Sequence, residues 1–329
     1  MTKRVVSGMR PTGKLHLGHL VGALRNWTEL QEQYDCFYFA ADWHALTTDY
    51  ADTSRLQSYV IDNVIDWIAA GVDPERSTIF VQSLVPEHAE LHLLLSMMIP
   101  IPWLERVPTY KELQGQLTEK DLSTYGFLGY PLLQTADVIM YDANFVPVGE
   151  DQVPHLELSR EVVRRVHHMH GRIFVEPEPL LTDFSRLPGL DNRKMSKSYQ
   201  NTIDLSDSVA DVETKVRAMY TDPKRVRADI PGTVEDNPVF TYHDAFNPDH
   251  DEVEDLKTRY REGRVGDVEV KKKLARALNA AMEPLRERRA ALDAHPERVR
   301  EIIHEGSRKA RVIAVETMKR VRDALHLAY

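Results

Sequence analysis

Short apolar runs alternate with longer amphipathic stretches through the first half of the chain. Each apolar run is followed by glycine or a polar residue, as is typical of parallel strands that are buried on both faces. These runs lie at residues 4–8, 36–41, 77–82 and 145–148. The longer stretches repeat their apolar positions at helical spacing. They lie at residues 15–24, 55–70, 86–98 and 157–168. Strands that alternate with helices predict an α/β fold, a Rossmann-like doubly wound parallel sheet.

The pattern changes near Pro188 and Gly189, beyond which most of the chain has helical spacing. The helical pattern is almost continuous from residue 251, with breaks near residues 263–266 and 295–296. We therefore predict a C-terminal helical domain. The two predicted domains are a Rossmann-like catalytic domain at residues 1–190 and, at residues 191–329, a polar loop followed by the helical domain.

The charge of the chain is unevenly distributed. The net charge is −9 over 329 residues, yet residues 257–323 hold 19 Lys and Arg against 11 Asp and Glu, a net +8. The remaining residues therefore carry −17. A basic helical tail can bind nucleic-acid phosphates while an acidic front avoids them. The charge alone is equally consistent with a solvated helical surface.

Cysteine content and hydropathy exclude several classes of protein. Cys36 is the only cysteine, so neither an internal disulfide nor a cysteine-rich zinc or iron–sulfur site can form. No apolar run approaches the roughly 20 residues of a membrane span, and the N-terminal stretch lacks the apolar core of a signal peptide. We therefore expect a cytoplasmic protein with no membrane partner.

The motif His16-Leu17-Gly18-His19 falls where the first predicted strand leads into the first predicted helix. Backbone N–H groups at a helix start and two imidazole donors favour a bound phosphate. Gly18 has no Cβ, so a flat ring can lie against its backbone. Taken alone, the motif also fits two histidines that pack in the protein or face solvent.

A second motif, Lys194-Met195-Ser196-Lys197-Ser198, lies in a polar loop ahead of the helical half. Its two ammonium groups and two hydroxyls can bind phosphate oxygens. Because Pro188-Gly189 and Asp191-Asn192 precede it, we expect a mobile loop that closes on a substrate. A solvated basic loop is the alternative.

H-x-G-H followed by K-M-S-K-S is the signature pair of class I aminoacyl-tRNA synthetases, which this chain resembles. Within that class it is similar to the bacterial tryptophanyl-tRNA synthetases essentially from end to end. The segments that carry the resemblance are S-G-M-R-P-T-G-K-L-H-L-G-H-L from Ser7, D-W-H-A-L-T from Asp42, F-V-Q-S-L-V-P-E-H-A-E-L from Phe80, Y-P-L-L-Q-T-A-D from Tyr130 and V-P-V-G-E-D-Q from Val146.

The resemblance implies an enzyme that uses ATP and Mg²⁺ to activate L-tryptophan and then transfers it to tRNA(Trp). It further implies a homodimer and a helical domain that binds the anticodon. The implied catalytic residues are His16, His19, Lys194 and Lys197. The implied ATP-binding residues are Arg10, Pro11, Thr12, Gly18, His19, Lys111, Gly149, Glu150, Asp151, Leu187, Lys194, Met195, Ser196, Lys197 and Ser198. The implied tryptophan-binding residues are Gly8, Tyr130, Gln134, Asp137, Val146, Val148 and Gln152. No protein ligand to a metal is implied.

By the same resemblance, Asp137 accepts the indole N–H. The chemistry is sound, because tryptophan has one polar side-chain group, a donor, and a buried carboxylate is a strong acceptor. A competitor that lacks the donor leaves the carboxylate unpaired, at a cost of about 1–3 kcal/mol or more. From its sequence context alone, Asp137 fits a helix cap or a solvent-facing residue equally well.

The chain departs from its relatives in three respects. Many of them have T-x-G-N at residues 16–19, glutamine in place of Arg10 and methionine in place of Gln134. Arg10 adds charge beside ATP, and Gln134 makes the indole pocket more polar. Three alternatives stay open: a tyrosyl-tRNA synthetase, a small-molecule nucleotidyltransferase, and a non-catalytic synthetase paralogue with a regulatory role.

Overall fold

The computed structural model describes residues 2–108, 110, 121–149, 152–181, 187–196 and 199–329. The chain forms two compact units, each assembled from separate stretches of sequence. Unit 1 comprises residues 1–13, 26–183 and 295–329, and unit 2 comprises residues 14–25 and 184–294. Residues 14–25 therefore belong to unit 2 although they lie early in the chain, and residues 295–329 return to unit 1.

Unit 1 is built on a five-stranded parallel sheet with the order β3-β2-β1-β4-β5. The strands are β1 (Arg4–Met9), β2 (Asp35–Ala40), β3 (Ser77–Val81), β4 (Phe145–Val148) and β5 (Glu178–Leu181). The chain winds outward from β1 to one side and then continues with β4 on the other. The strand order therefore reverses between β1 and β4, where α/β sheets bind ligands at their carboxyl ends. The predicted doubly wound α/β fold is confirmed.

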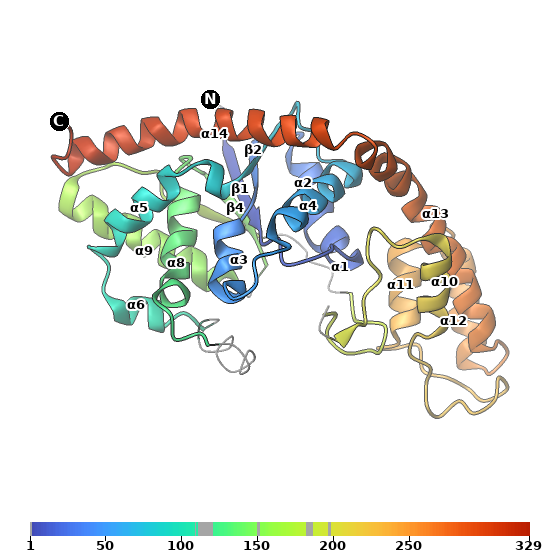
Figure 1. The fold of residues 1–329 in the computed structure, drawn as a ribbon. Coiled ribbons are helices and arrows are strands. Elements are labelled where there is room, and N and C mark those ends of the chain that lie inside the picture. Colours follow the sequence, from blue (N-terminus) through green and yellow to red (C-terminus); the bar gives the residue numbers. More distant parts are fainter. Residues whose placement is uncertain (1, 109, 111–120, 150–151, 182–186, 197–198) are drawn as a thin grey trace. The chain divides into compact units, whose positions relative to one another are not determined.

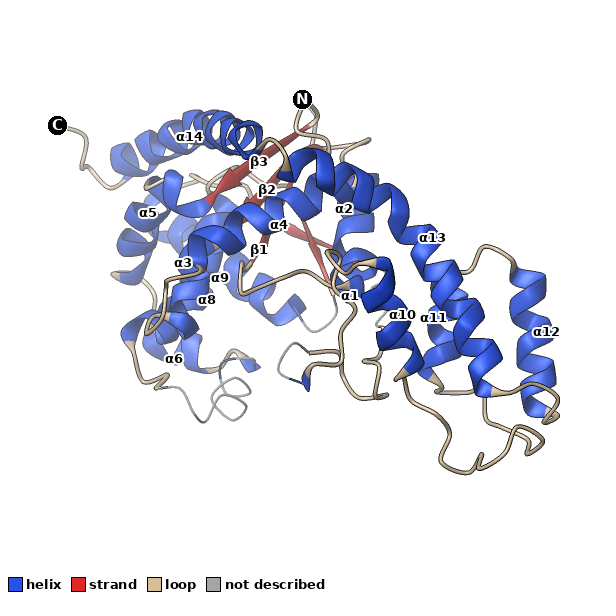
Figure 2. Cartoon of the chain, turned by 45° about the vertical axis from the view of Figure 1, so that its right-hand side comes forward, coloured by secondary structure: helices blue, strands red, loops and turns tan. Residues whose placement is uncertain are grey.

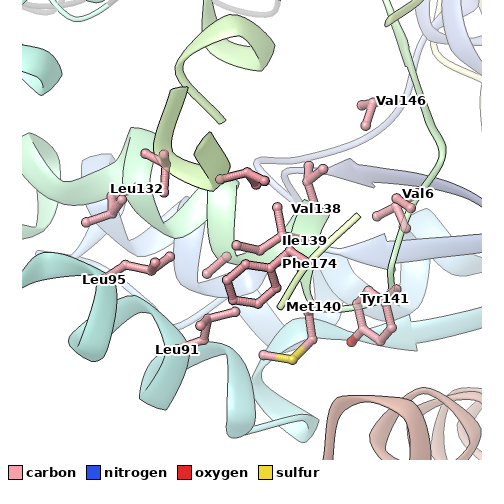
Figure 3. Packing of buried hydrophobic residues seen from close by; sticks show 14 of the residues in the cluster. Val6, Leu91, Leu95, Leu132, Val138, Ile139, Met140, Tyr141, Val146 and Phe174 are labelled. Carbon is pink, nitrogen blue, oxygen red and sulfur yellow. The ribbon is translucent and has the colours of Figure 1, made fainter. Parts of the chain in front are cut away.

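Helices cover the sheet of unit 1 (Figure 1). They are α2 (Arg25–Leu30), α3 (Asp42–Asp49), α4 (Leu56–Ala70), the short 3-10 helix η2 (Gln82–Leu84), α5 (Glu87–Ser96), α6 (Ile101–Glu105), α8 (Tyr125–Ile139), α9 (Val153–His170) and α14 (Pro296–Ala324). Helix α4 ends as predicted, since Gly71 takes the left-handed conformation (φ 115°) that glycine tolerates best. The core lies where α5 and α8 pack together with the sheet, and Figure 3 shows Leu91 and Leu95 of α5 facing Leu132 and Ile139 of α8.

The long helix α14 covers the edge strand β3. Gly306 lies so close to this strand that a Cβ on it would be 1.8 Å from the carbonyl oxygen of Ile79. Beside it, the Val81 N–H donates to Ser307 Oγ at 3.4 Å. The basic side chains of α14 reach acidic partners on unit 1: Arg311 pairs with Glu87, Arg320 with Asp142 and Arg322 with Glu90. Part of the basic tail therefore neutralises the acidic half instead of standing free.

Unit 2 is helical (Figure 2). It contains α1 (Leu17–His19), the π-helix η1 (Leu20–Leu24), α10 (Val209–Arg217), α11 (Pro238–Phe246), α12 (His250–Arg261) and α13 (Asp267–Asp293). Two buried cations stabilise it. Arg225 donates to the carbonyls of Ala228, Ile230 and Val265 and pairs with Asp267. Lys271 donates to the Met219 carbonyl and to Thr221 Oγ1. Among the described helices, none has both the length and the apolar character that crossing a membrane requires.

Candidate active site

The residues that the family resemblance implies for tryptophan binding lie in unit 1. Gly8 stands near the carboxyl end of β1, Val146 and Val148 are buried in β4, and Tyr130 and Asp137 are buried in α8. Two further residues assigned to the same ligand are Gln134, partly buried on α8, and Gln152, the N-cap of α9. Gly149 precedes that cap, and its carbonyl accepts the Gln152 N–H at 2.9 Å.

Asp137 lies at the centre of a buried polar network. Its side chain is 1 % exposed. Its Oδ2 is hydrogen-bonded to His44 Nε2 at 2.7 Å. Its Oδ1 accepts a hydrogen bond from Gln82 Nε2 at 2.7 Å and is hydrogen-bonded to His88 Nδ1 at 2.6 Å. This environment excludes a helix cap or a solvent-facing position for Asp137, the two roles that its sequence context left open.

The network keeps Asp137 ionised. Burial raises the pKa of this carboxyl, but the hydrogen bonds and charges of His44 and His88 outweigh that effect and bring the pKa down to about 2. A carboxylate has acceptor atoms only. Asp137 is therefore suited to a ligand that brings a hydrogen-bond donor.

Sequence reasoning missed His44 and His88 as site residues, and it placed Gln82 only at the end of a strand, where ligands of such sheets gather, without a role. Each follows a strand: His44 lies in α3 after β2, Gln82 begins η2 after β3, and His88 lies in α5 shortly beyond. The available signal was their position in the quoted segments from Asp42 and Phe80, at the carboxyl edge of the predicted sheet.

Arg10 is hydrogen-bonded to α3. Its Nη2 donates to Thr48 Oγ1 at 2.6 Å, whereas its buried Nε has no hydrogen-bond partner. Burial lowers the pKa of Arg10, and the charges of Asp49 and Tyr130 act in the opposite direction. A buried guanidinium N–H without a partner favours an added acceptor, such as a carboxylate or phosphate oxygen. Of the neighbouring residues assigned to ATP, Pro11 is buried and Thr12 is exposed.

Gly8 has a packing role besides any contact with a ligand. A Cβ at this position would lie 2.3 Å from the ring of Phe39 on the neighbouring strand β2. Any larger residue would force the Phe39 ring to shift, so the presence of glycine does not by itself indicate a ligand.

The two signature motifs meet within unit 2. The rings of His16 and His19 have centroids 3.9 Å apart, and the His16 N–H donates to His19 Nδ1 at 3.2 Å. A Cβ on Gly18 would lie 2.9 Å from the sulfur of Met195 and 3.0 Å from the His16 ring. The open face of Gly18 therefore accommodates Met195 of the second motif. Residues 15–24 were predicted as one helix, but they form the short α1 followed by the π-helix η1.

The described part of the loop that carries the second motif, residues 187–196, is tied to Asn201 by hydrogen bonds. The side chain of Asn201 makes two hydrogen bonds to the loop backbone. Asn201 Oδ1 accepts from the Ser196 N–H at 2.8 Å, and Asn201 Nδ2 donates to the Lys194 carbonyl at 3.1 Å. A Cβ on Gly189 would clash with Asn201 at 2.0 Å. Desolvation opposes ionisation of Asp191, but hydrogen bonds from Asn201 and Arg193 bring its pKa down to about 2. Leu187 is buried where this loop begins, and the Lys194 side chain is exposed.

Five residues assigned to ATP lie outside the described residues: Lys111, Glu150, Asp151, Lys197 and Ser198. Within the described part of the chain, no group of three or more His, Cys, Asp or Glu side chains is arranged to hold a metal ion.

Known proteins with similar sequences and structures belong to the family that the two signature motifs indicate. Residues 2–283 match the family model of class I tRNA synthetases (W and Y). The tryptophan–tRNA ligase of Thermotoga maritima is 50% identical over 327 residues, 99% of this chain and 100% of that protein. That of Treponema pallidum is 48% identical and covers 99% of this chain and 97% of its own length. A crystal structure of tryptophanyl-tRNA synthetase from Campylobacter jejuni, complexed with ADP and tryptophan, aligns with a TM-score of 0.90 at 32% identity and covers 98% of this chain and 100% of that one.

Proposed function

We propose that this chain activates L-tryptophan with ATP and transfers it to tRNA(Trp). The chain belongs to the family of class I tRNA synthetases (W and Y). Relatives named for tryptophan match nearly the whole chain at up to 50% identity, and a solved relative with the same fold binds tryptophan and ADP. The observation that carries the proposal is the buried, ionised Asp137, since such a carboxylate suits the single N–H donor of an indole.

Tryptophan recognition is assigned to unit 1. Asp137 accepts the indole N–H, and the buried side chains of Tyr130, Val146 and Val148 form apolar walls. Gln134 and Gln152 add polar contacts, the second to the substrate ammonium. The partnerless Nε of Arg10 is suited to bind the substrate carboxylate or the α-phosphate.

Phosphate recognition is assigned to unit 2. His16 and His19 stand at the start of α1, where backbone N–H groups favour an anion. Lys194 and the Ser196 hydroxyl supply further contacts to phosphate oxygens, together with Lys197 and Ser198. Mg²⁺ would be bound by the ATP phosphates.

The reaction needs no protein nucleophile and no general base. The tryptophan carboxylate, already ionised, attacks the α-phosphorus of ATP in line, and the bond to pyrophosphate breaks. The enzyme contributes positioning and charge stabilisation, with His19, Lys194 and Lys197 balancing the charge that moves onto the leaving pyrophosphate. The terminal ribose hydroxyl of the tRNA then attacks the carbonyl of the adenylate and displaces AMP.

Two surfaces fit the remaining partners. Unit 2 exposes basic side chains, including Lys224, Lys272 and Arg276, which are suited to the phosphates of the tRNA anticodon arm. Unit 1 exposes apolar side chains on α5, α6 and the start of α8, and a second copy that covers this surface would form the homodimer. They are Leu93, Met97, Ile101 and Tyr125. Because the substrates are ATP and tRNA, we propose a cytoplasmic location.

ATP–pyrophosphate exchange on the purified protein, with each of the twenty amino acids in turn, tests the proposal. Exchange that depends on tryptophan alone is the expected result. Exchange driven by tyrosine would keep the family and overturn the assigned substrate. No exchange with any amino acid would overturn the enzymatic function and favour a regulatory paralogue.

A further inference from the structure

We propose that His88 and Tyr141 are positioning residues that set the preference for an indole N–H, because together they fix the orientation of the Asp137 carboxylate. This inference rests on the proposed function, in which Asp137 accepts that N–H. Neither residue was singled out by the sequence, and neither is assigned a contact with substrate.

The contacts form a buried chain. His88 Nδ1 is bonded to Asp137 Oδ1 at 2.6 Å, and His88 Nε2 is bonded to the Tyr141 hydroxyl at 2.6 Å. The side chain of His88 and the whole of Tyr141 are 0 % exposed. Because the ionised carboxylate of Asp137 only accepts, Nδ1 of His88 carries a proton and donates to Oδ1. With Nε2 hydrogen-bonded to the Tyr141 hydroxyl, both ring nitrogens have protein partners, which fixes the orientation of the ring.

His88 bridges two residues that lie close together in the sequence, Asp137 and Tyr141. Asp137 lies near the end of α8, and Tyr141 follows it four residues later, about one helical turn along. His88, on the neighbouring helix α5, binds both. The His88 ring is also surrounded by aromatic rings, with centroids 6.2 Å from Phe39 and Phe80 and 5.4 Å from Tyr141. Figure 3 shows Tyr141 beside Met140 within the buried cluster.

The acceptor capacity of Asp137 shows what this orientation achieves. A carboxylate accepts about four hydrogen bonds, two on each oxygen. Oδ1 already has two partners, Gln82 and His88, whereas Oδ2 has one, His44. One acceptor position is left, and it lies on Oδ2. A partial rotation of the carboxylate would turn this remaining acceptor position in another direction, and the hydrogen bond to His88 opposes that rotation.

A specificity role differs from a purely structural one in how it affects two matched substrates. L-3-Benzothienylalanine has nearly the shape of tryptophan but carries sulfur in place of the indole N–H. General damage to the pocket lowers kcat/KM for both substrates by the same factor. Misorientation of Asp137 lowers it for tryptophan only, so the ratio of the two values falls.

The test is ATP–pyrophosphate exchange with both substrates, in the wild type and in Tyr141→Phe and His88→Asn. We expect the wild type to prefer tryptophan strongly and Tyr141→Phe to lower that preference about three- to tenfold, as befits one hydrogen bond. His88→Asn keeps a donor near the position of Nδ1 but loses Nε2, so it should behave like Tyr141→Phe. Tyr38→Phe is the matched control, because it also removes a buried tyrosine hydroxyl, one that donates to the Trp27 carbonyl at 3.0 Å.

The possible outcomes distinguish failure of the Asp137 role in the proposed function from failure of the positioning role of His88 and Tyr141. If the wild type does not prefer tryptophan over the isostere, the role of Asp137 in the proposed function fails. If the wild type does prefer it, but Tyr141→Phe and His88→Asn keep the ratio of the Tyr38→Phe control, only the positioning role fails. Should one variant not fold, the other decides the matter by the same ratio.

Discussion

Replacement of Gly306 by alanine is expected to destabilise unit 1 by displacing α14 from the edge of the sheet. The new Cβ would lie 1.8 Å from the carbonyl oxygen of Ile79 and 2.7 Å from its carbon. Ordinary carbon–oxygen contacts are about 3.3 Å or longer. The helix and the strand must therefore separate by roughly 1.5 Å at this point.

The magnitude follows from two opposing effects. Forced overpacking of this kind typically costs about 1–3 kcal/mol, and here the movement also stretches the bond from the Val81 N–H to Ser307, already 3.4 Å long. Alanine regains up to about 1 kcal/mol because it forms helix better than glycine. Since backbone atoms of β3 cannot rotate away as a side chain can, we expect a net loss of about 1–2 kcal/mol.

Gly126→Ala is the matched control. Gly126 is also helical and also in unit 1, but a Cβ there would meet no atom within 4 Å. We expect this variant to be unchanged or to gain up to about 1 kcal/mol. The two alanine variants should therefore differ by about 2 kcal/mol, which corresponds to roughly 4–8 °C in Tm for a unit of this size.

Urea unfolding followed by tryptophan fluorescence measures the effect, because all four tryptophans of the chain lie within unit 1. The midpoint should fall for Gly306→Ala and stay or rise for Gly126→Ala. Equal midpoints for the two variants would refute the reasoning, since they would show that α14 does not need this close approach to β3.

Two further predictions concern the candidate site. The pKa of Asp137 is about 2 in the folded chain, whereas its ordinary value is 3.8. This difference corresponds to about 2 kcal/mol of folding stability, which is present above pH 4 and is lost as the pH falls toward 2. Urea midpoints at pH 5 and pH 2.5 should therefore differ more in the wild type than in Asp137→Asn, and equal differences would contradict this. Gly18→Ala should raise the KM for ATP about tenfold by displacing Met195, with the KM for tryptophan unchanged; a rise in both would indicate general damage instead.

The sheet could be predicted because strands buried on both faces appear in the sequence as continuous apolar runs. Strand β5 could not, since Pro177 and Pro179 are typical of a linker. Proline is tolerated there because β5 lies at the edge of the sheet, where one side of the strand has no partner among the described strands.

The environment of Asp137 could be predicted only in part. The resemblance to a family indicated the aspartate, and the strand ends indicated the edge of the sheet. His44, Gln82 and His88 reach the same carboxylate from three different elements, and only the order of the strands brings those elements together. The assignment of residues 14–25 to unit 2 was likewise unpredictable, because it depends on backbone bonds such as that from the Leu17 N–H to the Ile203 carbonyl.

The position of α14 on β3 has a consequence for synthesis of the chain. Val81 and Ser307 are 226 residues apart in sequence. At about 5–20 residues per second, a ribosome takes roughly 10–45 seconds to pass from one to the other. Throughout that interval α14 is not there to cover the outer edge of β3, and an uncovered strand edge is a feature through which chains associate with one another. Newly made molecules should therefore depend on chaperones until α14 emerges, and the yield of folded protein should fall when translation is slowed between these two residues.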